Sequence, residues 1–384
     1  MRKIFMRLNW AWVYGCRCLI LLCLGPKRTG RWLGRVPYFP VAVEPFIEER
    51  FPLPKVFDQK PSLGIPSDGT WDQPKVKIEH LHYVARVKNG FADFQGCVFN
   101  ENFRPIHGAC HAHPLMEKYR RRLWKNGIET PYFQETCWPQ HFNGKVLVAT
   151  QSSQHTYTHW LLDILPRVGK ILAKGEPFDY LYIQHSFPFQ LESLKYLGIT
   201  VPILPVADYS LISGDELIVP CHQIAWNHHH PEWVINWVRN TFLPKEVKER
   251  QFPKRIFISR ARARVRRLLN EDEIFKIVSP LDFECVVLED LPFCEQVALF
   301  QQAECIVSPH GSGLANLIFC HPGTKVLELF PSFTVDHFYR VSTDVGLEYA
   351  FVKTRVLPAH RRANEDFAIE PADLMQGLQF LRIT

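Results

Sequence analysis

The C-terminal half of the chain alternates between short apolar runs and segments whose apolar side chains recur at helical spacing. The runs are rich in Ile, Val, Leu and Phe, which is typical of strands that are covered on both faces. We expect strands at residues 255–259, 283–288, 305–307 and 325–330, and helices at residues 271–278, 295–302 and 334–345. Strands in alternation with helices predict a parallel sheet with helices on its faces.

A similar alternation covers the middle of the chain. We expect strands at residues 145–149, 180–183, 202–206 and 216–219, and helices at residues 155–172, 189–197 and 231–242. Upstream, residues 76–87 and 91–99 are strand-like, and Asn89-Gly90 between them is a dipeptide preferred in hairpin turns. Two such series predict an α/β protein with two doubly wound lobes, whose ligands bind in the cleft between them.

The remaining segments set the predicted domain boundaries. Residues 36–74 are rich in proline and lack sustained periodicity, which predicts an extended connector. Pro244 and the charged run after it predict a linker between the lobes. The expected organisation is a leader at residues 1–35, the connector at 36–74, a first lobe at 75–243 and a second lobe at 244–384.

The leader is apolar between residues 8 and 24 and has basic residues on both sides. Arg17 lies in its middle, and a charge there costs about 2.5–3.5 kcal/mol on insertion scales. We therefore expect a helix on a membrane surface rather than one that crosses the bilayer. A poorly ordered leader whose tryptophans pack on the protein is equally compatible with the pattern.

The strand expected at 305–307 leads into a turn with concentrated polar chemistry. His310, Gly311, Ser312 and Gly313 interrupt the apolar run, and residues 314–319 resume at helical spacing. Glycines allow another molecule to approach the backbone, and the N–H groups of a helix start attract an anion such as a diphosphate. The alternative is that the glycines only permit tight packing.

A second cationic feature follows the strand expected at 255–259. Ser259 and Arg260 close that strand, and Asn270, a good N-cap with Glu273 at N3, opens the next helix. The loop between them carries Arg262, Arg264, Arg266 and Arg267. Arginine binds phosphate oxygens through paired hydrogen bonds, so we expect Arg260 to hold a diphosphate beside Gly311. For each of the other arginines in this loop, the simpler interpretation is a solvated side chain.

The helix expected at 155–172 carries candidate acid–base chemistry. His159 and Asp163 lie four residues apart, so a helix places them on one face, where they can form a hydrogen bond. A carboxylate beside a histidine raises the histidine pKa and makes the ring a proton acceptor near neutrality. The alternative is a histidine that only packs within an aromatic helix.

Composition narrows the partners and the compartment. The formal net charge of +6 is concentrated near residues 255–267, but no nucleic-acid-binding signature accompanies it, so we expect no nucleic acid partner. The 11 cysteines are an odd number without paired spacing, and the chain has no Asn-x-Ser/Thr sequon. These features favour the reducing cytoplasm, with peripheral membrane attachment through the leader.

Histidine-rich spots raise the question of zinc. His107, His111 and His113 lie close together, and His228, His229 and His230 are contiguous. Neither set has a recognised metal-ligand spacing, so we expect loop histidines and no metal site. A nicotinamide-dependent dehydrogenase is also disfavoured, because the glycine turn lacks the third glycine of its fingerprint.

Three separated motifs resemble those of the family 61 glycosyltransferases, and they occur in the family's order. The motifs are H-W-L-L-D-I-L-P-R, then F-I-S-R with R-R-L-L-N-E, and then S-P-H-G-S-G-L-A-N-L-I-F with P-G-T-K-V-L-E-L-F-P. The resemblance covers roughly residues 145–352. It implies a GT-B architecture of two Rossmann-like lobes and inverting transfer of a sugar, typically from a UDP-sugar, without an essential metal.

The resemblance also implies roles for individual residues. His159 and Asp163 match the motif of the acceptor lobe and are the catalytic candidates, although which of them is the base stays open. Glu328 is a candidate for the donor ribose, with a structural role as the alternative. The donor-binding positions implied are Ser259, Arg260, Arg267, Asn270, Glu271, His310, Gly311, Ser312, Gly313 and Glu328.

The expected function is therefore an inverting glycosyltransferase that moves a sugar from a nucleotide sugar to a hydroxyl of a saccharide or glycoconjugate. Assembly of a surface polysaccharide is the favoured setting, and a Golgi or ER lumen is the alternative location if the source is eukaryotic. The rival interpretation is a non-catalytic relative that binds a nucleotide sugar or a glycan.

Overall fold

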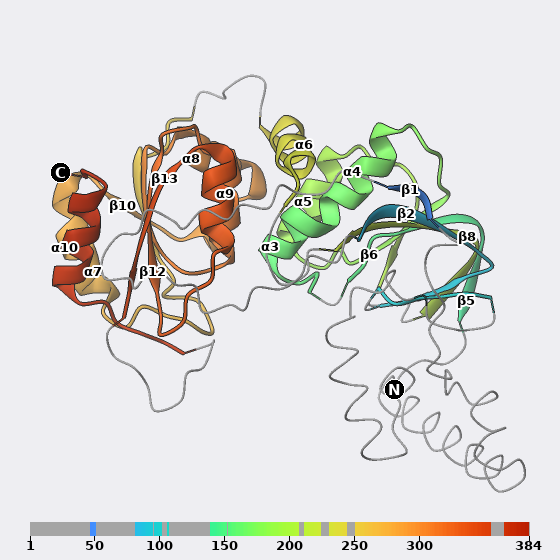
Figure 1. The fold of residues 1–384 in the computed structure, drawn as a ribbon, viewed down its shortest axis with the longest axis horizontal. Helices are drawn as coiled ribbons and strands as arrows, with labels where there is room; N and C mark the ends of the chain where they lie inside the picture. Colours follow the sequence, from blue (N-terminus) through green and yellow to red (C-terminus); the bar gives the residue numbers. More distant parts are fainter. Residues whose placement is uncertain are drawn as a thin grey trace, which may run out of the picture.

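The computed structural model describes part of the chain. The described residues are 47–50, 81–94, 96–101, 106, 139–151, 153–206, 211–223, 230–243, 250–354 and 365–383. They form two β-sheets with helices packed between and outside them (Figure 1). The leader at 1–35, most of the connector and the linker residues 244–249 lie outside the described residues, so the predicted domain boundaries stay predictions.

The C-terminal part forms a five-stranded parallel sheet in the order β10-β9-β11-β12-β13. Its strands are β9 (Arg255–Ile258), β10 (Glu284–Val286), β11 (Cys305–Pro309), β12 (Lys325–Phe330) and β13 (Glu348–Lys353). Its helices are α7 (Glu271–Val278), α8 (Phe293–Gln302), α9 (His337–Val345) and α10 (Pro371–Phe380). Three 3₁₀ segments complete it: η4 (Ser279–Leu281), η5 (Leu288–Asp290) and η6 (Ser312–Phe319).

Side chains alternate between the two faces of this sheet. Phe257, Val307 and Leu327 pack with α7 and α10 on the outer face. Ile256 and Ile306, one position earlier on two of these strands, pack with α8, α9 and η6 on the inner face. Both faces are therefore covered by helices, which explains why the strands are continuously apolar. The α/β class predicted for this part is confirmed.

The first sheet is mixed and has eight strands among the described residues, six of them in the order β1-β2-β8-β5-β6-β7. Strand β3 pairs with β8, and β4 pairs with β3. The strands are β1 (Ile47–Arg50), β2 (Leu81–Lys88), β3 (Phe91–Asp93), β4 (Val98–Phe99), β5 (Gln140–Val148), β6 (Tyr180–Ile183), β7 (Ile203–Pro205) and β8 (Leu211–Gln223). Strands β5 to β8 pair in parallel, whereas β1, β2 and β3 pair antiparallel. Strand β1 lies inside the segment that was expected to be an extended connector.

The hairpin predicted at Asn89-Gly90 is wrong. Strand β2 pairs Lys88 with Glu216, and β3 pairs Phe91 with Ser213 in the same antiparallel register along β8. Asn89 adopts a positive φ of 50°, yet its N–H donates to the Asp215 carbonyl and the ladder continues. The chain turns instead between β3 and β4, where Gly96 has a φ of 80°.

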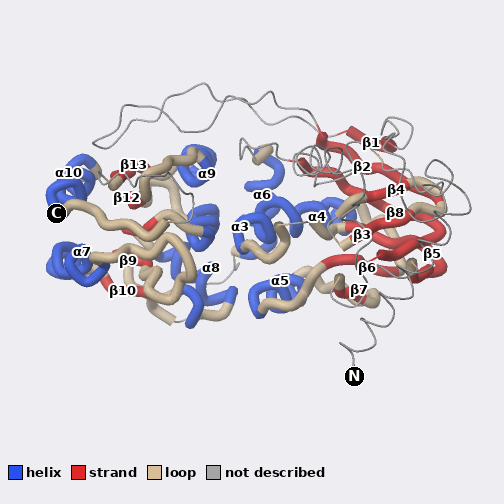
Figure 2. Tube along the Cα trace, turned by 90° about the horizontal axis from the view of Figure 1, so that it is seen from below, coloured by secondary structure: helices blue, strands red, loops and turns tan. Residues whose placement is uncertain are grey.

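The helices of the first part all lie, within the described residues, on the face of their sheet that points toward the second sheet (Figure 1 and Figure 2). They are α3 (Tyr157–His159), the π-helical segment η3 (Trp160–Ile164), α4 (Leu165–Ala173), α5 (Pro188–Tyr196) and α6 (Glu232–Phe242). The first three form one continuous helix, as the pattern over 155–172 predicted. Single π-helical turns are uncommon and frequently occur at functional sites.

One hydrophobic core joins the two parts. It includes Leu147 and Ile218 from the first sheet, Trp160 from η3, and Ile256 and Phe351 from the second sheet. Figure 2 shows the helical layer that carries this core between the two sheets. The two halves are therefore in direct contact through their helices.

Candidate functional site

The catalytic candidates lie on a helix that contacts the glycine turn of the other half. The Thr158 hydroxyl donates to the Ser312 carbonyl at 3.2 Å, and the Tyr157 hydroxyl donates to Asn316 Oδ1 at 2.6 Å. Asn316 is fully buried within η6. Two motifs more than 150 residues apart in sequence thus meet, and residue 159 follows directly after one of the contacts.

His159 and Asp163 form the hydrogen-bonded pair that their spacing predicted. His159 Nδ1 lies 2.5 Å from Asp163 Oδ2, with the imidazole side chain 32% exposed and the carboxylate 10% exposed. Burial lowers the pKa of His159, but the hydrogen bond and charge of Asp163 together outweigh burial, so the pKa is raised. A carboxylate can only accept, so Nδ1 carries the proton and Nε2 of the neutral ring is free to take one.

Arg260 lies directly against Gly311. A Cβ atom added to Gly311 would stand 2.0 Å from Arg260 Nη1, so any side chain at position 311 would collide with the guanidinium. The guanidinium donates to the Val265 carbonyl at 3.0 Å and the Arg266 carbonyl at 3.2 Å. Burial, and secondly the charge of Arg266, lower the pKa of Arg260 to about 10. It stays cationic at neutral pH, and a nearby anion would stabilise it further.

Ser259 and Glu271 hold the start of this arginine loop. Glu271 Oε1 accepts the Ser259 hydroxyl, and Oε2 accepts the Arg260 backbone N–H at 3.0 Å. The first residue of α7 therefore fixes the backbone of Arg260. Ser259 and Glu271 therefore hold the start of the loop in place.

Arg266 is a functional candidate that the sequence analysis did not single out. It has a positive φ of 57°, which a single sequence does not reveal for a residue other than glycine. Its Nε atom is buried without a hydrogen-bond partner among the described residues. Burial lowers its pKa, while the charge of Glu328 raises it. Arg266 and Arg260 together place two partly desolvated cations beside His310 and Gly311.

Arg267 and Asn270 are engaged by the C-terminal segment instead. The Arg267 guanidinium donates to Asp366 Oδ2 at 2.6 and 2.8 Å and is exposed, and this pairing raises its pKa. The Asn270 amide donates to the Ile369 carbonyl and accepts the Ile369 N–H. Asn270 precedes α7 as predicted, but its side chain makes no capping hydrogen bond. Their implied donor roles stay predictions, and the geometry shows both as anchors of residues 365–369.

His310 and Glu328 form a buried pair behind the glycine turn. His310 Nδ1 lies 2.5 Å from Glu328 Oε1, and the Tyr349 hydroxyl donates to Glu328 Oε2. The imidazole stacks on Phe330 with ring centroids 4.8 Å apart. Burial lowers the pKa of His310 despite the carboxylate. Glu328 is fully buried, so the geometry favours the structural alternative over contact with a ribose.

Residues 157–327 match the protein family described as Glycosyltransferase 61. These residues form a glycosyltransferase 61 domain. The resemblance noted in the three motifs is therefore confirmed. The domain spans the helix with His159 and Asp163, the arginine loop and the glycine turn, and it ends one residue before Glu328.

The glycosyltransferase 61 domain also has a curated relative. The chain is 26% identical over 141 residues to the EGF domain-specific O-linked N-acetylglucosamine transferase of Drosophila melanogaster. The similar segment covers 35% of this chain and 26% of the relative. The chain therefore spans about a quarter of the length of that relative.

Replacing Gly311 with alanine in the glycosyltransferase 61 domain should displace the Arg260 guanidinium. The φ of −179° suits any residue, and the colliding atom is the end of a flexible side chain, so the thermal midpoint should change little. If Arg260 holds the donor diphosphate, as the resemblance implies, the affinity for UDP should fall about tenfold or more, because a charge-assisted contact is lost. Calorimetric titration of UDP measures this affinity, and an unchanged value would mean that Arg260 does not contribute to the donor site.

Replacing Glu328 with glutamine should destabilise the protein. His310 and Tyr349 both donate to the carboxylate, and the glutamine amide can accept from only one of them. A buried unsatisfied donor costs about 1–3 kcal/mol, which urea unfolding resolves. Glu348→Gln, an exposed change on the neighbouring strand β13, is the matched control. Equal stability of both variants would contradict the structural role of Glu328.

Two further predictions from the sequence concern a bound metal ion and attachment to a membrane. Within the described ranges, no group of three or more His, Cys, Asp or Glu side chains could hold a metal ion. His107, His111, His113, His228 and His229 lie outside those ranges. None of the helices in the described part of the chain is both long and apolar enough to cross a bilayer. Cys97, Cys285, Cys294, Cys305 and Cys320 are free thiols.

Proposed function

We propose that the protein is an inverting glycosyltransferase that moves a sugar from a nucleotide sugar, with UDP as the favoured nucleotide, to a hydroxyl of a saccharide or glycoconjugate. The observation that carries the proposal is the contact between the His159 helix and the glycine turn on which Arg260 lies. The family match and the transferase named among its relatives support the same reaction class.

The reaction divides between the two halves. His159 Nε2 takes the proton of the acceptor hydroxyl, and that oxygen attacks the anomeric carbon of the donor sugar. The bond between the anomeric carbon and the diphosphate oxygen breaks as the new bond forms on the opposite face, so the configuration inverts. Asp163 fixes the ring orientation and stabilises the imidazolium that forms.

The leaving diphosphate needs positive charge. Arg260 and Arg266 supply two cations beside the backbone of the glycine turn, where partial burial strengthens their interaction with an anion. This charge performs the task that a divalent ion performs in other transferases, so we propose a metal-independent reaction. The donor would bind to the C-terminal part and the acceptor to the first part, in a GT-B arrangement of two lobes.

Two kinds of acceptor hydroxyl fit the proposed reaction. Assembly of a surface polysaccharide is our favoured setting, and cytoplasmic location with peripheral membrane attachment goes with it. The relative named above transfers O-linked N-acetylglucosamine to EGF domains, so a protein hydroxyl in a lumenal compartment is the alternative.

A panel of nucleotide sugars tests the proposal. The full chain is heated with each nucleotide sugar, and hydrolysis of the donor is followed in parallel. A ligand at 100 times its Kd stabilises a protein by about 2.7 kcal/mol, a readily measured shift. We expect one UDP-sugar to stabilise the chain and to be hydrolysed slowly. Stabilisation with neither hydrolysis nor transfer would favour the non-catalytic relative, and no stabilisation by any member would overturn the proposal.

A further inference from the structure

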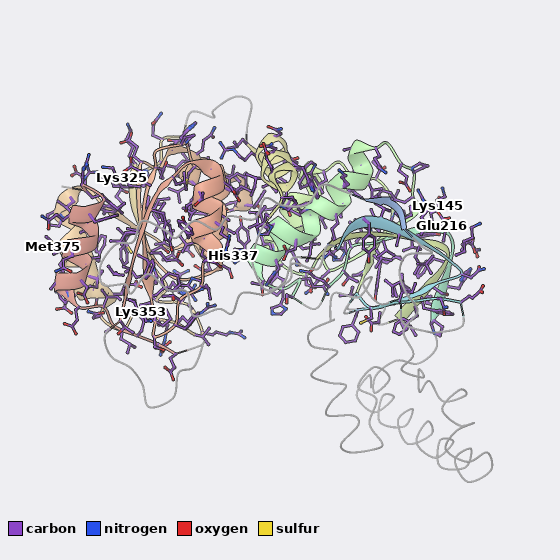
Figure 3. The ribbon with its side chains drawn as sticks, in the orientation of Figure 1. Lys145, Glu216, Lys325, His337, Lys353 and Met375 are labelled. Carbon is purple, nitrogen blue, oxygen red and sulfur yellow. The ribbon has the colours of Figure 1, made fainter. Side chains whose placement is uncertain are left out.

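Two histidines meet where the two halves pack together. His230 precedes α6 and His337 is the first residue of α9, beside the helices of the first part (Figure 3). Their Nε2 atoms are 3.5 Å apart, and their rings stack with centroids 5.7 Å apart and planes 25° apart. Both side chains are buried. Such a contact requires one Nε2 to donate and the other to accept.

The other side of His230 faces the catalytic pair. Its Nδ1 atom lies 3.8 Å from Asp163 Oδ1, while Asp163 Oδ2 is bonded to His159. The four groups therefore form a line from the partly exposed His159 ring to the start of α9 in the donor half. Helix α6 packs against η3 on one side and α9 on the other, which holds the line in place.

The positions of the protons on the ring nitrogens along this line are constrained. The 3.8 Å separation is longer than a hydrogen bond, but the nearby carboxylate favours the tautomer of His230 with its proton on Nδ1, the nitrogen that faces Asp163. The neutral His230 ring then presents Nε2 as an acceptor, and His337 Nε2 must donate. Each histidine thereby sets the tautomer of the next.

We propose that His230 and His337 are positioning residues for the base, with His230 orienting Asp163 and His337 fixing the tautomer of His230. The proposal rests on the glycosyl transfer proposed above. It gives the donor half a direct influence on the proton acceptor of the other half.

Other ionisable groups surround the line. Segment η6 carries none. Asp336, which precedes α9, and Arg340 of α9 pair with each other at 2.5 Å, which largely neutralises them. The remaining groups on the packed elements are Tyr157 of α3, Arg167 and Lys170 of α4, Glu232 and Arg239 of α6, and Tyr339 and Asp344 of α9. The test therefore compares variants that leave all of these unchanged.

The experiment uses His337→Phe, His337→Gln and His230→Leu in the full chain, with turnover measured across pH. Glutamine keeps an N–H donor near the Nε2 position, whereas phenylalanine keeps only the ring. Losing the donor toward Asp163 leaves the carboxylate more basic, which raises the pKa of His159. We expect His337→Phe and His230→Leu to lower kcat about tenfold, to move the acidic limb of the profile to higher pH, and to leave UDP affinity unchanged. His337→Gln should recover most of the loss.

His321→Phe, an exposed histidine between η6 and β12, is the matched control and should behave as wild type. An unshifted acidic limb in His337→Phe and His230→Leu, or a loss confined to thermal stability, would overturn the positioning role. Absence of turnover in the wild type itself would instead be a failure of the proposed glycosyl transfer.

Discussion

Replacing His159 with glutamine should lower kcat by about 10²–10⁴-fold, the usual contribution of a general base. Glutamine keeps similar size and polarity but cannot take a proton at neutral pH. The imidazole is partly exposed, so the fold should tolerate the change. Turnover of a UDP-sugar measures the effect. His155→Gln, an exposed histidine one turn earlier in the chain, should retain wild-type turnover.

The pH dependence of turnover is a second test of His159 as the base, because the direction in which the acidic limb moves can be predicted. The base must be neutral, so activity should rise as pH increases through the His159 pKa, which Asp163 raises. Asp163→Asn removes the negative charge, so the pKa falls and the acidic limb should move to lower pH. Its kcat should also fall, because the ring orientation is lost. A limb that stays in place would exclude His159 as the titrating group.

Replacing Arg260 with alanine should abolish measurable turnover, with a loss of at least about 10²–10³-fold. The change removes a partly desolvated cation that lies against Gly311 and that is fixed through Glu271. Circular dichroism should show an intact fold, because the strand and helix on either side keep their own contacts. The KM for the donor should rise as well, since the diphosphate is bound in both ground and transition states.

Arg262→Ala is the matched control for this prediction. It removes the same charge from the same loop, but Arg262 is exposed and pairs with Asp290. Exposed ion pairs contribute little to stability, so the variant should fold and turn over normally. Equal losses in both variants would mean that net loop charge matters rather than a specific guanidinium.

Periodicity in the sequence predicted most of the regular elements. Strands β6 and β12 and helix α7 occur at the predicted residues, because each is a short apolar run or a complete amphipathic turn between clear stop signals. The Asn89-Gly90 turn was mispredicted for a tertiary reason. Strand β8 is long enough to pair with both flanking segments, and this ladder overrides the local turn preference.

The site was predictable in outline but not in the direction of its side chains. The pairing of His159 with Asp163 follows from helical spacing alone. The choice between Arg266 and Arg267 does not, because it depends on a positive φ at Arg266 and on Asp366, which lies 99 residues after Arg267. The contact between His230 and His337 joins the segment before α6 to the start of α9, and their approach depends on the packing of the two halves, so no local pattern indicates it.

Calorimetric titration of UDP into two variants, His159→Gln and Arg260→Ala, beside the wild type tests whether donor binding and catalysis are divided between the two halves. In the proposed reaction, the C-terminal part binds the diphosphate and the first part supplies the base. We expect His159→Gln to bind UDP like the wild type although its turnover is strongly lowered, and Arg260→Ala to lose at least about tenfold in affinity. Wild-type UDP affinity in Arg260→Ala, or equal losses of affinity in both variants, would contradict this division of roles between the two halves.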